Sequence, residues 1–426
     1  MSEIRKIWMW NLRKLGALIL TGAVTLFMTE TVDISGLQQN ITNDSSVMEN
    51  AVTDDDVERN IRNLVGTQTK EKLSKTATPV EDFTYRIDQD YAVIEKYNGR
   101  DTQVEIPNVI EGRYVGAIAD DAFTDNLYLE KVVMPDTIVY IGSRAFMNCT
   151  KLTEVELPAM LITLCSRAFE GCTSLKTVTR RTAEDGENYS IRTIESAAFK
   201  NCTALEAIDL SGDIFQKVSI GDNAFENCIS LQQVVMPQNI YAIGGSAFKG
   251  CISLLSVDLY NVVDIRSEAF RGCTGLTEVT IPGTVSGVGW SAFADCTSLA
   301  SVTLLGRELS PIEEGVAIDS YAFANTAISE ITVPGFYGYI GSYCFESCPN
   351  LTKFVWEDSN KNVADQSMGD NVFADSMNLV EVHLPLTVNY IRGWDVSRTG
   401  TPVIYAPEGS VAHAFAVEKG ISFVAE

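Results

Sequence analysis

The chain has 426 residues, of which 46% are hydrophobic and 21% are charged. This composition supplies enough apolar side chains for a large core and excludes a wholly disordered chain. The 32 basic and 56 acidic residues give a net charge of −24. We therefore expect no nucleic-acid partner, because binding to phosphates needs clustered lysine and arginine, and we expect no attraction to an anionic membrane surface.

Residues 1–31 have the pattern of an export signal. Four basic residues lie within the first 14 positions, and an uncharged run follows from Leu15 to Thr29. A secretory signal peptide has this order of segments, and the run is too short to span the roughly 30 Å hydrocarbon core of a bilayer. The cleavage motif around Thr31 is poor, so two interpretations stay open. The segment is a cleaved signal peptide or an uncleaved signal anchor, which would be the one expected membrane contact.

Residues 32–82 are polar and acidic, as expected of a linker. Within this segment, Thr53 and the three aspartates after it mark a helix start, where the helix dipole favours negative charge. Apolar residues from Val57 to Val65 then fall on one helical face. The pattern predicts a short helix over 54–65, with a solvated linker of transient helicity as the alternative.

Residues 83–402 are built from a repeat that an Ala-Phe step marks most clearly. Spacings of 22 to 30 residues separate the marker phenylalanines, and a period of this length predicts a solenoid. We expect eleven units after a degenerate first unit, with residues 403–426 as a C-terminal cap. The marker residues are Phe123, Phe146, Phe169, Phe199, Phe225, Phe248, Phe270, Phe293, Phe323, Phe345 and Phe373.

The residues around each marker phenylalanine predict one short helical turn per unit. Serine or aspartate, which are helix N-cap types, stands three residues before the phenylalanine in nine of eleven units. Glycine, asparagine or aspartate stands two residues after it in ten of eleven units. These three types tolerate the left-handed conformation that ends a helix.

A strand follows the predicted helical turn. In the unit that ends at Pro158, Leu152, Val155 and Leu157 are apolar, and the last two alternate with the polar Glu154 and Glu156. This alternation predicts a strand with one buried face. An apolar residue also stands five positions before each marker phenylalanine, as Ile141 does before Phe146, and is expected to close the core. The predicted fold is an α/β repeat solenoid, a horseshoe or rod of stacked parallel short strands.

The combined pattern L-x-x-V-x-L and I-G-x-x-A-F-x-x-C-x-x-L resembles the BspA-type leucine-rich repeat (LRR), a class of bacterial and protist surface proteins. The unit at Phe323 departs from the pattern because it is one residue short before Ile328. The resemblance implies an extracellular or cell-surface location and adhesion to proteins of a host or a neighbouring cell. It does not fix the target.

Eight of the ten cysteines stand three residues after a marker phenylalanine. Stacked coils would hold their Cβ atoms about 5 Å apart, beyond the roughly 3.8 Å of a disulfide. We therefore predict buried free thiols. A straight ladder of thiols also cannot surround a zinc ion.

The sequence offers no pattern typical of catalysis. His383 and His413 lie in no triad or metal motif, and no nucleophile elbow, zinc-protease motif or phosphate-binding loop occurs. We expect no catalytic residue, no metal and no cofactor, and predict that the chain is not an enzyme.

The outward positions of the stacked strands are the predicted partner-contact face. We expect them to form a continuous exposed ladder. The alternative is that they are ordinary solvent-exposed strand residues without a binding role. Longer spacings place insertions at 181–190, 306–315 and 357–366, all along one edge. The candidate contact residues are Glu154, Glu156, Asp209, Gln233, Asp258 and Glu278.

The leading hypothesis is a secreted or surface-displayed module that binds a protein through this face and this edge. A structural or spacer protein of the cell envelope without a specific ligand is the alternative. An exported glycan-processing enzyme, working with paired carboxylates, is the third hypothesis.

Overall fold

The computed structural model describes residues 77–88, 90–181, 191, 193–211, 217–306, 316–359 and 366–426. The chain divides into two compact units, residues 1–69 with 87–91 and residues 70–86 with 92–426. The second unit holds the repeats and is described by itself. The predicted signal segment at 1–31, the linker up to residue 76 and the predicted helix over 54–65 lie outside the described residues.

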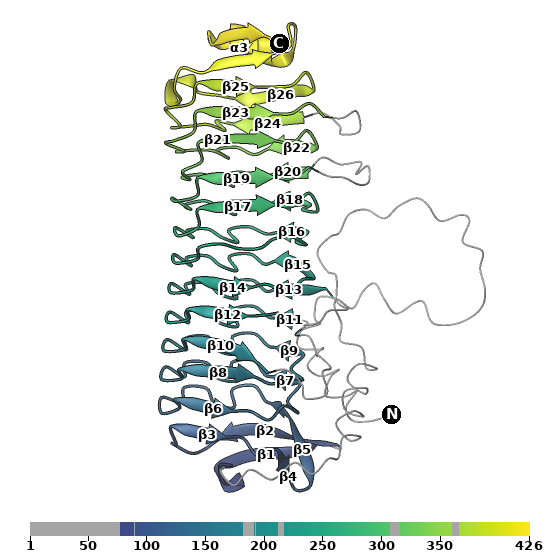
Figure 1. The fold of residues 1–426 in the computed structure, drawn as a ribbon, viewed down its shortest axis with the longest axis vertical. Helices are drawn as coiled ribbons and strands as arrows, with labels where there is room; N and C mark the ends of the chain where they lie inside the picture. The colour runs from purple at the N-terminus through teal and green to yellow at the C-terminus, as the bar shows by residue number, and fades with distance from the viewer. Residues whose placement is uncertain are drawn as a thin grey trace, which may run out of the picture. The chain divides into compact units, whose positions relative to one another are not determined.

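The repeats form a parallel β-solenoid of about 13 turns. Within their unit the coils stack as a straight column (Figure 1). Of the two predicted shapes, a horseshoe and a rod, the column is the rod. Most coils contribute short strands to two sides of the column. Along the first side, the described residues form one sheet of 15 strands. Its strands are β1 (Phe83–Asp88), β2 (Tyr91–Tyr97), β4 (Val109–Ile110), β5 (Arg113–Ile118), β7 (Tyr140–Ile141), β9 (Thr163–Leu164), β11 (Thr193–Ile194), β13 (Val218–Ile220), β15 (Ile240–Ile243), β16 (Asp264–Ile265), β18 (Gly287–Val288), β20 (Val316–Ile318), β22 (Tyr337–Ile340), β24 (Gln366–Asp370) and β26 (Val388–Gly393).

The second side holds the strands predicted from the L-x-x-V-x-L pattern. In the described residues they form three separate sheets of six, two and five strands. The first sheet contains β3 (Gln103–Glu105), β6 (Lys131–Val133), β8 (Glu154–Leu157), β10 (Thr177–Arg180), β12 (Ala207–Asp209) and β14 (Gln233–Val235). The second contains β17 (Glu278–Ile281) and β19 (Ser301–Leu304). The third contains β21 (Glu330–Val333), β23 (Lys353–Trp356), β25 (Glu381–His383), β27 (Val403–Ala406) and β28 (Ser422–Ala425).

The predicted helical turn in each coil is wrong. The described residues contain one α-helix, α3 (Val411–Lys419), and two short 3₁₀ segments, η1 (Val80–Asp82) and η2 (Val396–Arg398). Around each marker phenylalanine the chain instead makes successive turns. In the Phe146 coil, the N–H groups of Ala145, Met147 and Cys149 donate within the coil, each to the carbonyl three residues earlier.

The N–H groups of Arg144, Phe146 and Asn148, which alternate with these three, donate to the next coil, and this alternation excludes a helix. Arg144 donates to Ser166, and Phe146 donates to Ala168 at 2.7 Å. An α-helix needs every amide to bond within its own chain segment. The first side also differs from the prediction, because the apolar residue five positions before the phenylalanine ends a strand of the 15-stranded sheet in ten of the eleven units and lies inside such a strand in the eleventh.

Left-handed residues stand two positions before and two positions after every marker phenylalanine. The later position was predicted and is confirmed, as Asn148 with φ 60° and Gly171 with φ 75° show. The earlier position was missed because it carries no glycine in any of the eleven units, and Arg144 with φ 58° is typical of it. Both positions are the third residue of a four-residue turn, where a type II turn requires a positive φ.

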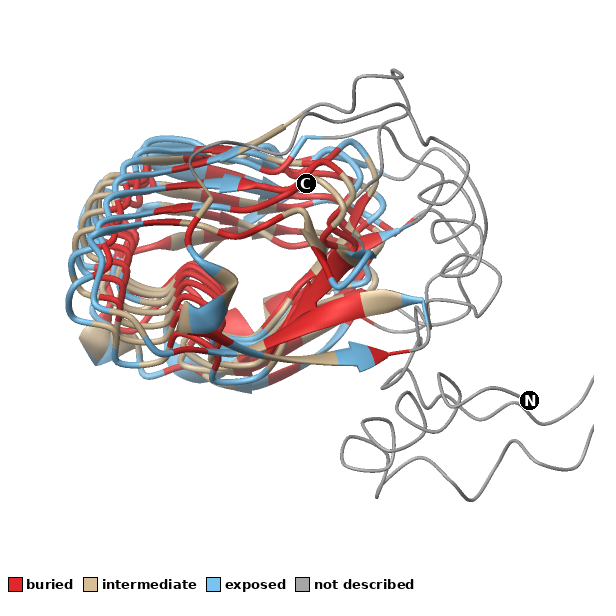
Figure 2. Ribbon diagram, turned by 90° about the horizontal axis from the view of Figure 1, so that it is seen from below, coloured by how far each residue is buried: buried red, intermediate tan, exposed pale blue. Residues whose placement is uncertain are grey.

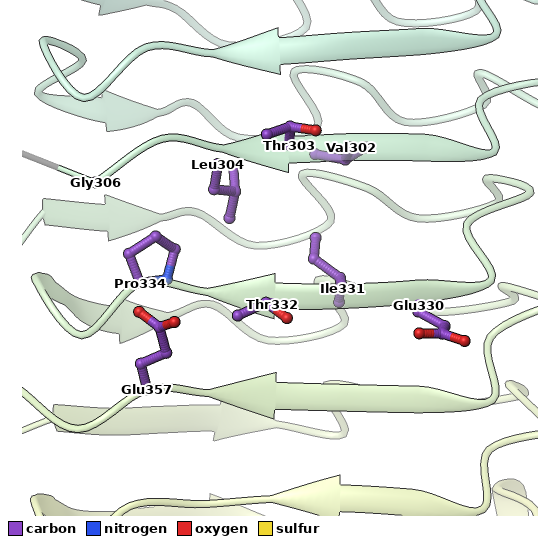
Figure 3. A pocket seen from close by; sticks show the side chains of 9 residues that line it. All are labelled: Val302, Thr303, Leu304, Gly306, Glu330, Ile331, Thr332, Pro334 and Glu357. Carbon is purple, nitrogen blue, oxygen red and sulfur yellow. The ribbon is translucent and has the colours of Figure 1, made fainter.

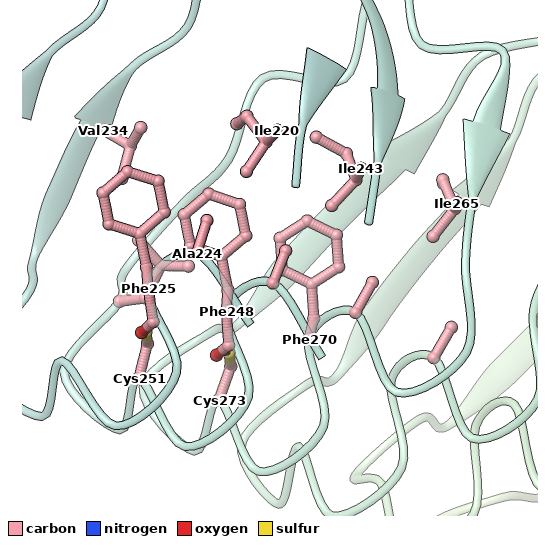
Figure 4. Packing of buried hydrophobic residues seen from close by; sticks show 14 of the residues in the cluster. Ile220, Ala224, Phe225, Val234, Ile243, Phe248, Cys251, Ile265, Phe270 and Cys273 are labelled. Carbon is pink, nitrogen blue, oxygen red and sulfur yellow. Dashed lines mark hydrogen bonds between the residues drawn. The ribbon is translucent and has the colours of Figure 1, made fainter. Parts of the chain in front are cut away.

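The marker phenylalanines form one continuous stack along the inside of the coils. From Phe123 to Phe373 each ring lies on the next with centroids 4.7 to 6.1 Å apart. Figure 4 shows three of these rings in the same orientation above the cysteine position, and Figure 2 shows that buried stretches recur at the same places from coil to coil. Because the rings are almost fully buried, the stack is the centre of the core.

Aromatic residues close both ends of this stack. Tyr97 stacks on Phe123 with centroids 5.5 Å apart. At the other end Trp394 packs on Phe373 at 5.2 Å, and Phe415 of α3 stacks on Trp394 at 6.1 Å. Each terminal ring is thereby covered, as an array with exposed ends requires.

Truncating one interior ring tests the stack. Phe248 lies between Phe225 and Phe270, with centroids at 5.1 and 5.3 Å. Phe248→Ala should lower the free energy of unfolding by about 3–5 kcal/mol, because it leaves a cavity between two coils. Leu255→Ala, at an exposed position of the same coil, should change it by less than about 0.5 kcal/mol. Urea unfolding followed by circular dichroism measures both, and equal effects would contradict a stack that carries the stability.

Candidate binding face

The predicted contact residues of the first half of the array lie together. Glu154, Thr177, Ala207 and Gln233 stand on four neighbouring strands in one register. In the same sheet, Glu156 and Asp209 also point outward, and all the predicted contact residues on these strands are exposed. From β8 to β14 the face therefore has the predicted arrangement.

Cations neutralise part of this acidic surface. Lys131 stands beside Glu154 on β6 and donates to its carboxylate at 2.5 Å, which raises the pKa of the lysine ammonium. Arg181 pairs with Glu156 at 2.9 Å and with Asp136 at 3.0 Å. The face is therefore less acidic than the composition suggests, and exposed pairs of this kind contribute little to stability.

The predicted ladder is interrupted in the coil of Phe248. Residues 255–259 belong to no strand, so Asp258 and Glu278 lie outside the sheet that holds Glu154. The side chain of Asp258 accepts the N–H of Tyr260 at 3.0 Å. Such a local turn competes with strand pairing. The expectation of a continuous ladder is therefore wrong at this coil.

Two consecutive coils at this interruption carry exposed apolar side chains. Two consecutive coils expose 42% of Ile229, 48% of Ile252, 58% of Leu255 and 75% of Tyr260. Val235 of the first coil adds a further exposed side chain. We call these five residues the apolar patch. Part of this patch is visible in the sequence. Ile229 and Ile252 stand four residues after a phenylalanine, where most units have a polar or small residue.

A second interruption separates β19 from β21. Between these strands lies a cleft of about 400 Å³. Figure 3 shows its lining residues on β19 and β21 and Glu357 just after β23. This cleft coincides with the coil that is one residue short, and it was not predicted.

The three predicted insertions lie mostly outside the described residues, but their flanks are described. Each insertion joins the end of a second-side strand to the start of a first-side strand: β10 to β11, β19 to β20 and β23 to β24. Because every coil turns the same way, these six ends lie along one edge of the column.

The cysteines form a ladder of buried free thiols, as predicted. Each thiol at the repeated position donates to a phenylalanine carbonyl of the preceding coil, as Cys251 does to Phe225 at 3.1 Å. Burial raises the pKa of Cys149, Cys228 and Cys296 to about 12. These thiols are therefore structural donors rather than nucleophiles, since the reactive form is the thiolate.

The two histidines take part in packing near the end of the array. His383 stacks on Tyr405 with centroids 4.5 Å apart and lies between the carboxylates of Glu381 and Glu426. His413 stacks on Phe423 at 4.2 Å. The described part of the chain contains no cluster of three or more metal-ligating side chains. None of its helices has the length and apolarity of a membrane span.

A family model described as the BspA type leucine rich repeat region matches the chain six times. The matches cover residues 116–218, 218–316 and 312–395. Curated proteins include no match to the chain.

Several solved structures are similar to this chain. A leucine rich cell surface protein from Faecalibacterium prausnitzii is 22% identical with a TM-score of 0.45, and the match covers 84% of this chain and 96% of that chain. A leucine-rich repeat protein from Bacteroides ovatus is 20% identical with a TM-score of 0.35, covering 75% and 100%. The leucine rich repeat protein of T. pallidum is 23% identical with a TM-score of 0.30, covering 65% and 91%.

The thiol ladder predicts selective labelling. At pH 8 a thiol with a pKa of about 12 is almost wholly protonated, and burial blocks access. Iodoacetamide should therefore leave the native protein unlabelled and label all ten cysteines after unfolding in urea. Intact-protein mass spectrometry counts the labels. Several labels added rapidly to the folded chain would contradict the ladder.

Proposed function

We propose that this chain, which belongs to the BspA-type leucine-rich repeat family, is a non-enzymatic module that binds a protein partner at the cell surface or after secretion. The apolar patch is the observation that carries this proposal. Contiguous exposed apolar residues on a soluble surface commonly mark a site of protein interaction. Here they lie on a face that rigid stacking holds in place.

The charge of the surrounding face would select the partner. The carboxylates of Asp209 and Asp258 accept local N–H groups, and neither makes a salt bridge of 4.0 Å or less with a described residue, although Arg180 lies close enough to Asp209 to interact with its charge. A partner with basic residues around an apolar centre would complement this surface. Charges at the rim of an interface mainly steer association and exclude wrong partners.

The location and the absence of catalysis rest on other observations. The pattern of residues 1–31 supports export, and the family is a class of surface proteins. The buried, protonated thiols and the stacked histidines support a chain that binds rather than reacts.

A matched pair of variants tests the binding proposal. The full chain would be used to retain proteins solubilised from the surface of neighbouring or host cells, and the retained partner would be purified and titrated. Ile252→Ser with Leu255→Ser should weaken its affinity at least tenfold, because central apolar contacts dominate interfaces. Leu127→Ser with Val380→Ser changes equivalent exposed positions of distant coils and should leave the affinity within twofold.

The same experiment separates the alternatives. A structural spacer would retain no partner at all. A partner that tolerates the patch variant but loses affinity with the control variant would place the binding site elsewhere and contradict the proposal.

A further inference from the structure

An exposed indole stands at a corner of the column, two residues after β18. Trp290 is three residues before its marker phenylalanine, where nine of the eleven units have serine or aspartate. The residue is 43% exposed. Because the other units make the same turn without a ring at this position, the fold does not require Trp290.

Two tyrosines of the next two coils lie beside this indole. The rings of Tyr321 and Tyr343 stack on each other with centroids 5.1 Å apart and an angle of 8° between their planes. The ring of Trp290 meets that of Tyr321 at 74°, with centroids 6.3 Å apart. Trp290 and Tyr321 therefore form an aromatic corner on the surface of the column.

A carboxylate stands next to the aromatic corner. β20 pairs with the end of β18, with Ile318 opposite Val288. The N–H group of the following residue, Asp319, donates to the carbonyl of Val288 at 2.8 Å. Asp319 therefore lies in the coil after that of Trp290, one position before the level of the indole.

An equivalent pair of residues shows where this carboxylate is directed. Glu195 and Ser166 hold the same positions in their two consecutive coils as Asp319 and Trp290 hold in theirs. The carboxylate of Glu195 accepts the N–H and the hydroxyl of Ser166, both at 2.9 Å. The carboxylate of Asp319 accordingly faces the preceding coil at Trp290.

Asp319 lacks the partner that Glu195 has, because Trp290 carries no hydroxyl group. The side chain of Asp319 is half-buried and makes no ion pair or hydrogen bond with another residue of the described ranges. Burial raises the pKa of its carboxyl group. A positive charge placed beside this carboxylate would stabilise its ionised form.

We propose that Trp290, Tyr321 and Asp319 bind the guanidinium group of an arginine side chain that belongs to the protein partner. A guanidinium is planar, so it can stack on an aromatic face and direct two N–H groups to a carboxylate. The net charge of −24 favours a cationic ligand over an anionic one. This inference rests on the proposed function and adds a contact that is separate from the apolar patch.

The indole signals of the full chain provide the first test. The chain has five tryptophans, and a nitrogen–proton correlation spectrum resolves their indole N–H groups. Trp290→Ser identifies the signal of Trp290. N-acetyl-arginine amide should shift this signal and leave those of the buried Trp356 and Trp394 in place. N-acetyl-citrulline amide, which has the shape of arginine without its charge, should bind with a Kd at least fivefold higher.

Matched variants provide the second test. Glycine and serine are the commonest residues at the repeat positions of Asp319 and Trp290, so Asp319→Gly and Trp290→Ser restore the regular repeat. Asp319→Gly should raise the Kd of the arginine probe at least threefold, whereas Glu278→Gln, at an exposed position elsewhere, should change it less than twofold. Trp290→Ser should lower saturation transfer from the protein to the probe at least fivefold. Tyr390→Ser, which removes another exposed ring, should change this transfer less than twofold.

The outcomes separate this inference from the proposed function. Equal affinity for the arginine and citrulline probes, or equal loss in the site and control variants, would overturn the arginine site. An unchanged affinity of Trp290→Ser for the purified partner would overturn the assignment of the arginine to that partner. Loss of both probe and partner binding in the two site variants alone would support the inference. Failure of the proposed function would appear instead in the variants of the apolar patch, which leave this site intact.

Discussion

Contact between each coil and the next is the constraint on which the rest of this structure depends. A coil of 22 to 30 residues cannot cover its own apolar side chains. The phenylalanine rings stack face to face along the column, and the N–H group of Phe146 donates to the coil that follows. The chain alternates these bonds with bonds inside its own turns, so the same few residues shape a coil and attach it to its neighbour.

This division lets the surface vary while the core stays regular. The unit at Phe323 is one residue short, yet its ring keeps its place in the stack. Only the outer strands are affected, since β19 and β21 belong to different sheets. The coil of Phe248 has no strand on the second side. It exposes Leu255 and Tyr260, yet the ring of Phe248 is fully buried. The apolar patch therefore lies where the outer ladder is interrupted.

The sequence predicted what strict periodicity controls: the stacked coils, the second-side strands outside the Phe248 coil and the left-handed residue after each phenylalanine. It predicted helical turns wrongly, because serine and aspartate before Phe146 and its equivalents are turn residues as well as N-cap residues, and only bonding between coils distinguishes the two. The first-side strands were missed since only Ile141 and its equivalents repeat there. The shortened unit before Ile328 was visible, but a cleft follows only once the neighbouring strands are in place.

Hydrogen exchange followed by mass spectrometry with residue resolution tests the central claim most directly. Amide hydrogens that bond between coils beside the stack, such as those of Phe146 and Phe248, should exchange slowest and at similar rates along the array. Rapid exchange at these amides, in the native protein, would show that stacking does not hold the coils together and would contradict this account.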